Sequence, residues 1–234
     1  MHTRLMIAFA LSWLLVAKDE TLPQVSKTER FDLSSSGTVR LEHSTGELTI
    51  QGWDEPQVEI TTIESAKPSS GPIDRDTATR RLEQVRITTE HRGMDLVIAT
   101  ALPGRRVPLL SRNTDDVNID YHLKVPRKAH LVIDHGEGEV HLEDLSGDIE
   151  AAVHRGLIVL RLPQDAQYDI DAKTRLGNVY SDFPGSIRNR FWRVGHELVQ
   201  PVSATSPKLH FRVGYGDILI LKMTEKPAST AAFH

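Results

Sequence analysis

The chain has 234 residues, of which 26% are charged and 39% are hydrophobic, and its formal net charge is −4. A chain of this length can bury a sizeable core, as one large β domain or two small domains. The weak negative charge excludes the basic field on which nucleic-acid binding depends, so we expect no nucleic-acid partner. The sequence contains no cysteine, which excludes disulfides, thiolate metal sites and a lipid-modified cysteine.

The amino-terminal end is typical of an export signal. Arg4 precedes an unbroken apolar or small run from Leu5 to Ala17, and Lys18 follows at once. A run of this length is too short to cross a bilayer core comfortably but fits the hydrophobic region of a signal peptide. We therefore expect a signal peptide or an N-terminal anchor at residues 1–17, no transmembrane span in the mature protein, and a location in the periplasm or at the cell surface.

A polar segment follows, and then the strands begin. We interpret residues 18–30 as a linker, residues 31–222 as one domain and residues 223–234 as a flexible tail. Within the domain, a unit of glycine, any residue and an aliphatic residue recurs, and apolar residues continue at alternate positions, which is typical of a strand with one buried face. Each unit is interpreted as one strand, opened in a turn by a glycine with positive φ. The glycines of these units are Gly37, Gly46, Gly138, Gly147, Gly156, Gly177 and Gly216.

One helix is predicted among the strands, at residues 74–84. Ala78 and Leu82 recur at a spacing of four, as on the buried face of a helix. Asp74 and Asp76 lie at the amino-terminal end, where the helix dipole favours acids. This helix is expected to cover an end or a side of the β domain.

The pattern as a whole predicts an all-β fold, with short strands stacked as a β-solenoid or flattened roll. Short units that each expose an apolar face must stack to bury that face, as repeat architectures do. A two-residue period does not reveal strand direction, so an antiparallel sandwich stays open as the alternative.

Several phrases of the sequence resemble the bacterial putative-adhesin domain family. They are GELTIQGWDEPQVEI at residues 46–60, VNIDYHLKVPRKAHLVIDHGEGEVHLEDLSGDIEA at 117–151, LGNVYSDF at 176–183 and VGYGDILIL at 213–221. The resemblance implies an exported domain of stacked short strands, similar to a β-solenoid, in a bacterial cell envelope. The family's motifs are structural glycines and aliphatic residues, so the resemblance supplies no catalytic residue.

No residue pattern assembles a known catalytic or metal site. The 11 histidines form no HExxH, His-x-His or similar ligand pattern, so we expect no metal site and no cofactor. The histidines of the strands, among them His135 and His141, are interpreted as polar residues that face water. Asp169 and Asp171 share a strand face and are interpreted as solvated surface acids.

The strongest binding candidate is an irregular stretch, residues 187–196. It combines arginines with large aromatic residues, a composition suited to gripping a polyanion or stacking on sugar rings. The alternative is a hairpin whose aromatic residues cap the core while its arginines stay solvated. The candidate binding residues are Arg188, Arg190, Phe191, Trp192, Arg193 and His196.

The sequence therefore predicts a non-catalytic, exported cell-envelope protein with an adhesin-like binding or scaffold role. We expect its partner to be an envelope polysaccharide or another protein, and the oligomeric state stays open. The alternative is a carbohydrate-active enzyme, a lyase or hydrolase on a β-helical scaffold, because such scaffolds host acids and bases that are scattered in sequence.

Overall fold

The computed structural model describes residues 23–67, 75–101, 117–164, 167–189, 195–200 and 206–223. The predicted signal peptide or anchor at 1–17 and the predicted tail beyond Met223 lie outside these residues. In chain order the elements are β1 (Gln24–Asp32), β2 (Thr38–Thr45), β3 (Leu48–Trp53), β4 (Gln57–Ala66), α1 (Arg75–Leu82), β5 (Arg86–Arg92), β6 (Asp95–Ala101), β7 (Val117–Pro126), β8 (His130–Glu143), β9 (Ile149–Leu162), β10 (Asp169–Leu176), β11 (Val179–Ser181), β12 (Ser186–Asn189), β13 (His196–Gln200) and β14 (Lys208–Lys222). Within the described part, this arrangement confirms the predicted all-β class with a helix near residues 74–84.

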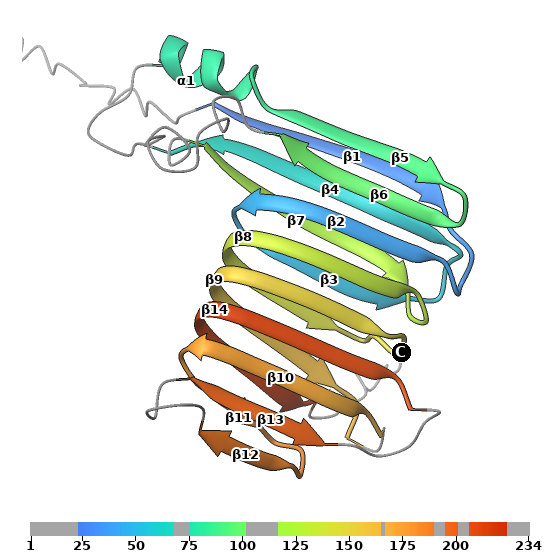
Figure 1. Ribbon diagram of the computed structural model, residues 1–234. Helices are drawn as coiled ribbons and strands as arrows, with labels where there is room; N and C mark the ends of the chain where they lie inside the picture. Colours follow the sequence, from blue (N-terminus) through green and yellow to red (C-terminus); the bar gives the residue numbers. More distant parts are fainter. Residues whose placement is uncertain are drawn as a thin grey trace, which may run out of the picture.

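A stack of parallel strands forms the centre of the molecule (Figure 1). Strand β8 pairs in parallel with β9, β9 pairs with β14, and β14 pairs with β10 and β11. Strands β2 and β3 both pair in parallel with β8, one with each of its halves. Each layer of the stack therefore has two arms, and the buried apolar side chains form one continuous core. The parallel pairing rules out the antiparallel sandwich for this central part.

A glycine lies at the bend between the two arms of each layer. Gly138, Gly156 and Gly216 lie in the middle of β8, β9 and β14, while Gly46 separates β2 from β3 and Gly177 separates β10 from β11. Their φ angles, from 122° to 148°, lie in a region that favours glycine. A Cβ atom at Gly156 would lie 1.7 Å from the carbonyl oxygen of Gly138, so neighbouring bends stack backbone on backbone. The first arms are the parts that precede these glycines, and the second arms are the parts that follow.

The sequence interpretation of the glycines needs two corrections. A glycine-led unit corresponds to one arm instead of one strand, because β8, β9 and β14 continue through their bends. The expected positive φ is wrong at Gly37 and Gly147, which lie outside that region. A Cβ atom at Gly147 would lie 2.3 Å from the carbonyl oxygen of Ala129. Close approach of another backbone, and not the φ angle, therefore requires glycine at this position.

Further strands extend the stack at both ends. β7 and β6 join it in parallel, whereas the strands beyond them and those at the opposite end pair antiparallel. At one end β7, β4 and β1 continue from β3, and the β6–β5 hairpin continues from β2. At the other end β13 and β12 continue from β10. The interpretation of residues 18–30 as a linker is wrong from Gln24 onward, because β1 pairs with β4 along its whole length. Most side chains of β1 are exposed, so the sequence shows no apolar alternation there.

The helix α1 lies at the end of the stack formed by β1 and β5 (Figure 1) and contacts β4. Ala78 and Leu82 are buried, whereas Asp76 and Arg80 are exposed, as the amphipathic pattern predicts. Among the residues that the structure describes, no helix is long and apolar enough to cross a membrane.

The order of the layers in space differs from their order in the chain. β14 is the last described strand in the chain, but it lies between β9 and β10. Strands β10 to β13, which precede β14 in sequence, therefore lie beyond it, toward the end opposite α1 (Figure 1).

One row of the core, three residues before each bend glycine, is polar at both ends. Register places His43, His135, Val153, Val213 and Thr174 at equivalent positions in successive layers. The imidazole rings of His43 and His135 stack with their centroids 4.7 Å apart, and their exposed fractions are 4% and 0%. The expectation that His135 faces water is therefore wrong.

Burial keeps this histidine pair neutral. Nε2 of His43 donates a hydrogen bond to the carbonyl oxygen of Ile119 at 2.8 Å, whereas neither ring nitrogen of His135 has a partner of normal geometry among the described residues. Desolvation lowers the pKa of His43 to about 3 and that of His135 to about 4. Both rings are therefore uncharged at pH 7.

Candidate functional site

The outer face of the first arms carries charged side chains of both signs. Core-facing and outward-facing side chains alternate along each strand, so register brings the outer residues of neighbouring strands side by side. Register aligns His210 with Asp171, Arg212 with Lys173, and Lys173 with Glu197. We call this surface the outer charged face. Its further charged members are Arg40, Glu42, Asp134 and Glu150.

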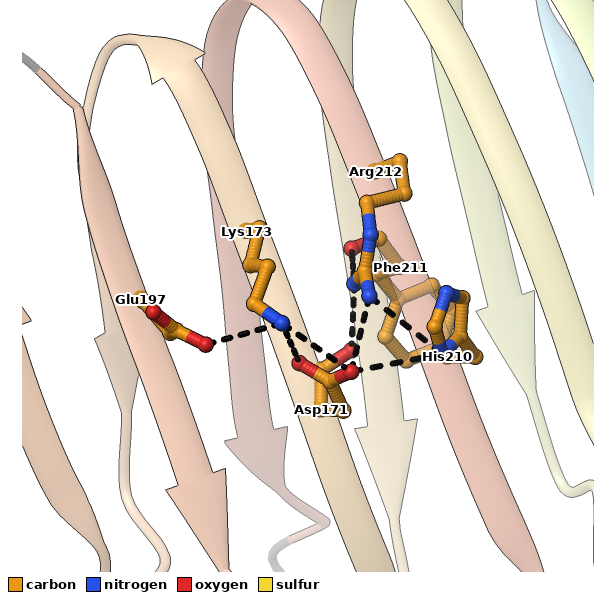
Figure 2. A network of polar contacts seen from close by, with 6 residues as sticks. All are labelled: Asp171, Lys173, Glu197, His210, Phe211 and Arg212. Atoms are coloured by element: carbon orange, nitrogen blue, oxygen red, sulfur yellow. Dashed lines mark hydrogen bonds and ion pairs between the residues drawn. The ribbon is translucent and has the colours of Figure 1, made fainter. Parts of the chain in front are cut away.

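Asp171 lies at the centre of an ion-pair network on this face, shown in Figure 2. Arg212 donates a hydrogen bond from Nη2 to Asp171 Oδ2 at 2.7 Å and another from Nη1 to the main-chain carbonyl oxygen of Asp171 at 3.2 Å. Nζ of Lys173 lies 3.2 Å from Asp171 Oδ1 and 2.8 Å from Glu197 Oε1. Nδ1 of His210 lies 3.4 Å from Asp171 Oδ2, so protonation of His210 would add a cation to the network. The side chain of Asp171 is 32% exposed, which corrects its interpretation as a freely solvated acid.

The network holds Asp171 and Lys173 charged at neutral pH. Burial alone would raise the pKa of Asp171, but hydrogen bonds from Arg212 and Lys173 outweigh burial, so this pKa lies below its ordinary value. The hydrogen bond to Glu197 is the main cause that raises the pKa of Lys173. A general acid needs a pKa near the working pH, and a carboxylate held ionised does not meet that requirement. The network therefore suits the binding of polar groups better than proton transfer.

Two shallow hollows lie on the outer charged face beside the network. The first, of about 410 Å³, lies over β2, β8, β9 and β14, and the second, of about 390 Å³, lies over β8, β9, β10 and β14. Both are open to solvent, and they adjoin because they share Asp134, Ala152 and Arg212. The small residues Val132, Ala152 and Gly214 leave room between the longer charged side chains. Together the hollows form one depression that runs across the strands.

Several charges along this depression are available to a ligand. Arg40, Glu42, Asp134 and Arg175 are exposed, and none of them makes a side-chain ion pair or hydrogen bond with another described residue. Glu42 and Asp134 are neighbours in the register of β2 and β8, so two like charges lie side by side. Within the described part of the chain, no three His, Asp or Glu side chains converge on a position that could hold a metal ion.

The predicted binding stretch, residues 187–196, lies only partly within the described residues. Strands β12 and β13 pair antiparallel, as the hairpin alternative predicts. Outside the described residues lie Arg190, Phe191, Trp192 and Arg193, and of Arg188 only the backbone is described. His196 is half-buried, and its Nδ1 donates a hydrogen bond to the carbonyl oxygen of Gly177 at 2.8 Å. Nδ1 of His196 is therefore occupied by a hydrogen bond within the fold.

Sequence reasoning missed the network because its members are brought together by strand order. Asp171 and Arg212 are 41 residues apart, and they meet only because β14 lies beside β10. The available signal was the alternation, which places both residues at outer positions of their strands. Alternation identifies the face of a strand but does not identify the strand's neighbours.

No protein-family model matches the chain, and no curated protein sequence matches it. Among solved structures, the fold is similar to a putative cell adhesion protein from Clostridium sporogenes, with a TM-score of 0.44 and 14% identity over 85% of this chain and 100% of that chain. It is also similar to a putative lipid binding protein from Parabacteroides distasonis (TM-score 0.26, 9% identity, 85% of this chain and 97% of that chain). A putative adhesin from Bacteroides fragilis matches with a TM-score of 0.23 and 9% identity over 85% of this chain and 97% of that chain.

Proposed function

We propose that this protein is a non-catalytic, exported cell-envelope protein that binds an extended envelope polysaccharide across its outer charged face. The depression formed by the two hollows carries this proposal, because it is open, lined by charged side chains of both signs and continuous over neighbouring strands. Sites for small molecules are usually concave enough to bury most of the ligand. An open, charged depression offers a long polar chain many separate contacts instead. The proposed export rests on the sequence of residues 1–17.

The scaffold supports this proposal through its regular spacing. Neighbouring strands of a sheet lie about 4.8 Å apart, so the outer side chains form rows with a fixed repeat. We interpret the glycine-led arms as the units of a β-solenoid-like scaffold that holds these rows rigid. A rigid surface loses little conformational entropy when a polymer binds.

Retention of the purified protein on insoluble envelope polysaccharides and peptidoglycan tests the proposal, with mass spectrometry of any fragments released. We expect retention without fragments. The variant that combines Arg40→Gln with Asp134→Asn should lose most of this retention, because it removes two unpaired charges from the depression. The control is Arg92→Gln, which removes an exposed arginine of β5 at the far end of the stack and should be retained like the wild type.

The other outcomes identify other functions. Release of fragments would identify a carbohydrate-active enzyme and would contradict the proposal. Loss of retention on every polymer would also contradict it and would direct the search to a protein partner. Equal retention of all variants would show that the polymer binds elsewhere on the molecule.

A further inference from the structure

The residues directly before the glycine bends change in character along the stack. Register pairs Glu137 with Arg155, Arg155 with Tyr215, and Tyr215 with Leu176. The row is therefore charged at β8 and β9 and becomes aromatic and aliphatic at β14 and β10. Tyr215 and Leu176 are 38% and 40% exposed. Exposed apolar side chains that lie side by side mark an interaction site more often than scattered ones do.

Two side chains of β9 lie against the ring of Tyr215. The guanidinium carbon of Arg155 lies 5.9 Å from the centroid of the tyrosine ring, and the ring of His154 meets it edge to face with centroids 5.9 Å apart. Among the described residues, Arg155 has one ion pair, with Glu137 at 4.0 Å, and both side chains are well exposed. An ion pair of this length in solvent is weak, so Arg155 stays available for an anion.

The second hollow adjoins this tyrosine through His154. Gly214 and Ala152 line the hollow, and a Cβ atom at Gly214 would lie 2.5 Å from the carbonyl oxygen of His154, so no larger residue fits there. Arg175 also lines the hollow and has no ion pair with another described residue. The hollow is thus a notch with a small-residue floor and an unpaired cation in its lining, and Tyr215 lies beside its lining residue His154.

We infer that Tyr215 and this notch form the subsite for one sugar residue of an acidic polysaccharide, a polymer of uronic acid. This inference rests on the proposed function and names its ligand class. The apolar face of a pyranose ring packs on the ring of Tyr215, and its carboxylate binds Arg155 or Arg175 through charge-assisted hydrogen bonds. A neutral sugar would cover both arginines and remove them from water without offering them a negatively charged partner. A polyphosphate chain would offer the tyrosine no apolar face.

Calorimetric titration of the whole protein with polygalacturonate oligomers and, separately, with dextran oligomers tests the inference. We expect tighter binding of polygalacturonate, weakened when the salt concentration rises from about 0.05 M to about 0.5 M. Tyr215→Ala and the double variant Arg155→Gln with Arg175→Gln should each bind at least about tenfold more weakly, the effect of losing one stacking or charged contact. Tyr215→Phe keeps the ring and should bind within about twofold of the wild type.

Controls separate this inference from the proposed function. Arg92→Gln should bind polygalacturonate like the wild type, and thermal unfolding should show that each variant is folded. The inference is overturned if dextran and polygalacturonate bind with equal affinity, or if the tyrosine and arginine variants bind with wild-type affinity. In either case, retention on polysaccharide would leave the proposed function standing. Loss of binding to every polysaccharide would overturn both.

Discussion

Replacement of Gly156 by alanine should destabilise the fold through two separate effects. Gly156 has a φ angle of 148°, and an L-residue in such a conformation costs roughly 1–3 kcal/mol. The added Cβ atom would lie 1.7 Å from the carbonyl oxygen of Gly138, so β8 and β9 must move apart at the bend. Overpacking of this kind costs about 1–3 kcal/mol. The expected loss of unfolding free energy is therefore about 2–6 kcal/mol.

Two other glycines isolate the two effects. Gly93 has a φ angle of 68°, but an added Cβ atom would meet nothing within 4 Å, so Gly93→Ala should cost only about 1–2 kcal/mol for its conformation. Gly147 has no positive φ, but its Cβ atom would lie 2.3 Å from the carbonyl oxygen of Ala129, so Gly147→Ala reports the steric effect alone. We expect Gly156→Ala to exceed both.

Urea unfolding followed by circular dichroism measures the three free energies, and thermal unfolding provides a second measure. For a chain of this size, 1 kcal/mol corresponds to roughly 2–4 °C in Tm, so Gly156→Ala should lower Tm by on the order of 10 °C. If Gly156→Ala and Gly93→Ala lower the free energy of unfolding by the same amount, the stacking of backbone on backbone at the bends has no energetic consequence. That result would refute the prediction.

The remaining predictions concern titratable groups. Burial lowers the pKa of His43 to about 3 and that of His135 to about 4, from 6.5, so their contribution to stability is complete above pH 6.5 and is lost progressively as the pH falls toward 4. His135→Val repeats the residue of the next layer, Val153, and should make the urea midpoint depend less on pH in this window; an unchanged dependence would contradict this account. The pKa of Asp171 is lowered, so its ion pairs stabilise the fold above the pKa of the unfolded carboxyl group and are lost as the pH falls through the folded pKa. Asp171→Asn should therefore cost only about 0.5–1 kcal/mol at neutral pH, because solvent screens this partly exposed network, and less in acid; an equal loss in acid would show that the charge is not responsible.

The local part of the fold could be predicted because side-chain direction is set by the backbone. The alternation in residues 117–125 predicts a strand, and Val117, Ile119, Tyr121 and Leu123 of β7 are all buried. The same rule indicated the position of His135, which has the same parity as Leu131 and Ile133 of β8. Because histidine is polar, its residue type favoured a position that faces water, but the alternation of side chains along the strand places it in the core.

The pairing of the strands could not be predicted, because it depends on contacts between distant segments. Nothing in the sequence around β14 indicates that this strand separates β9 from β10, and the outer network depends on that arrangement. The glycine pattern likewise predicted the units but not that two arms belong to one strand, because a bend and a turn both favour glycine. The edge strand β1 was missed because neither of its faces is buried enough to require apolar residues.

β14 is synthesised after every other described strand, yet it lies between β9 and β10, which are synthesised before it. Until β14 emerges, β9 and β10 have no common neighbour, and their facing edges carry unpaired N–H and C=O groups. A nascent chain of this protein therefore cannot complete its stack from the amino-terminal end onward, and it presents open edges that favour aggregation until β14 has been made. A chain that crosses a membrane unfolded could complete its core only after β14 had crossed.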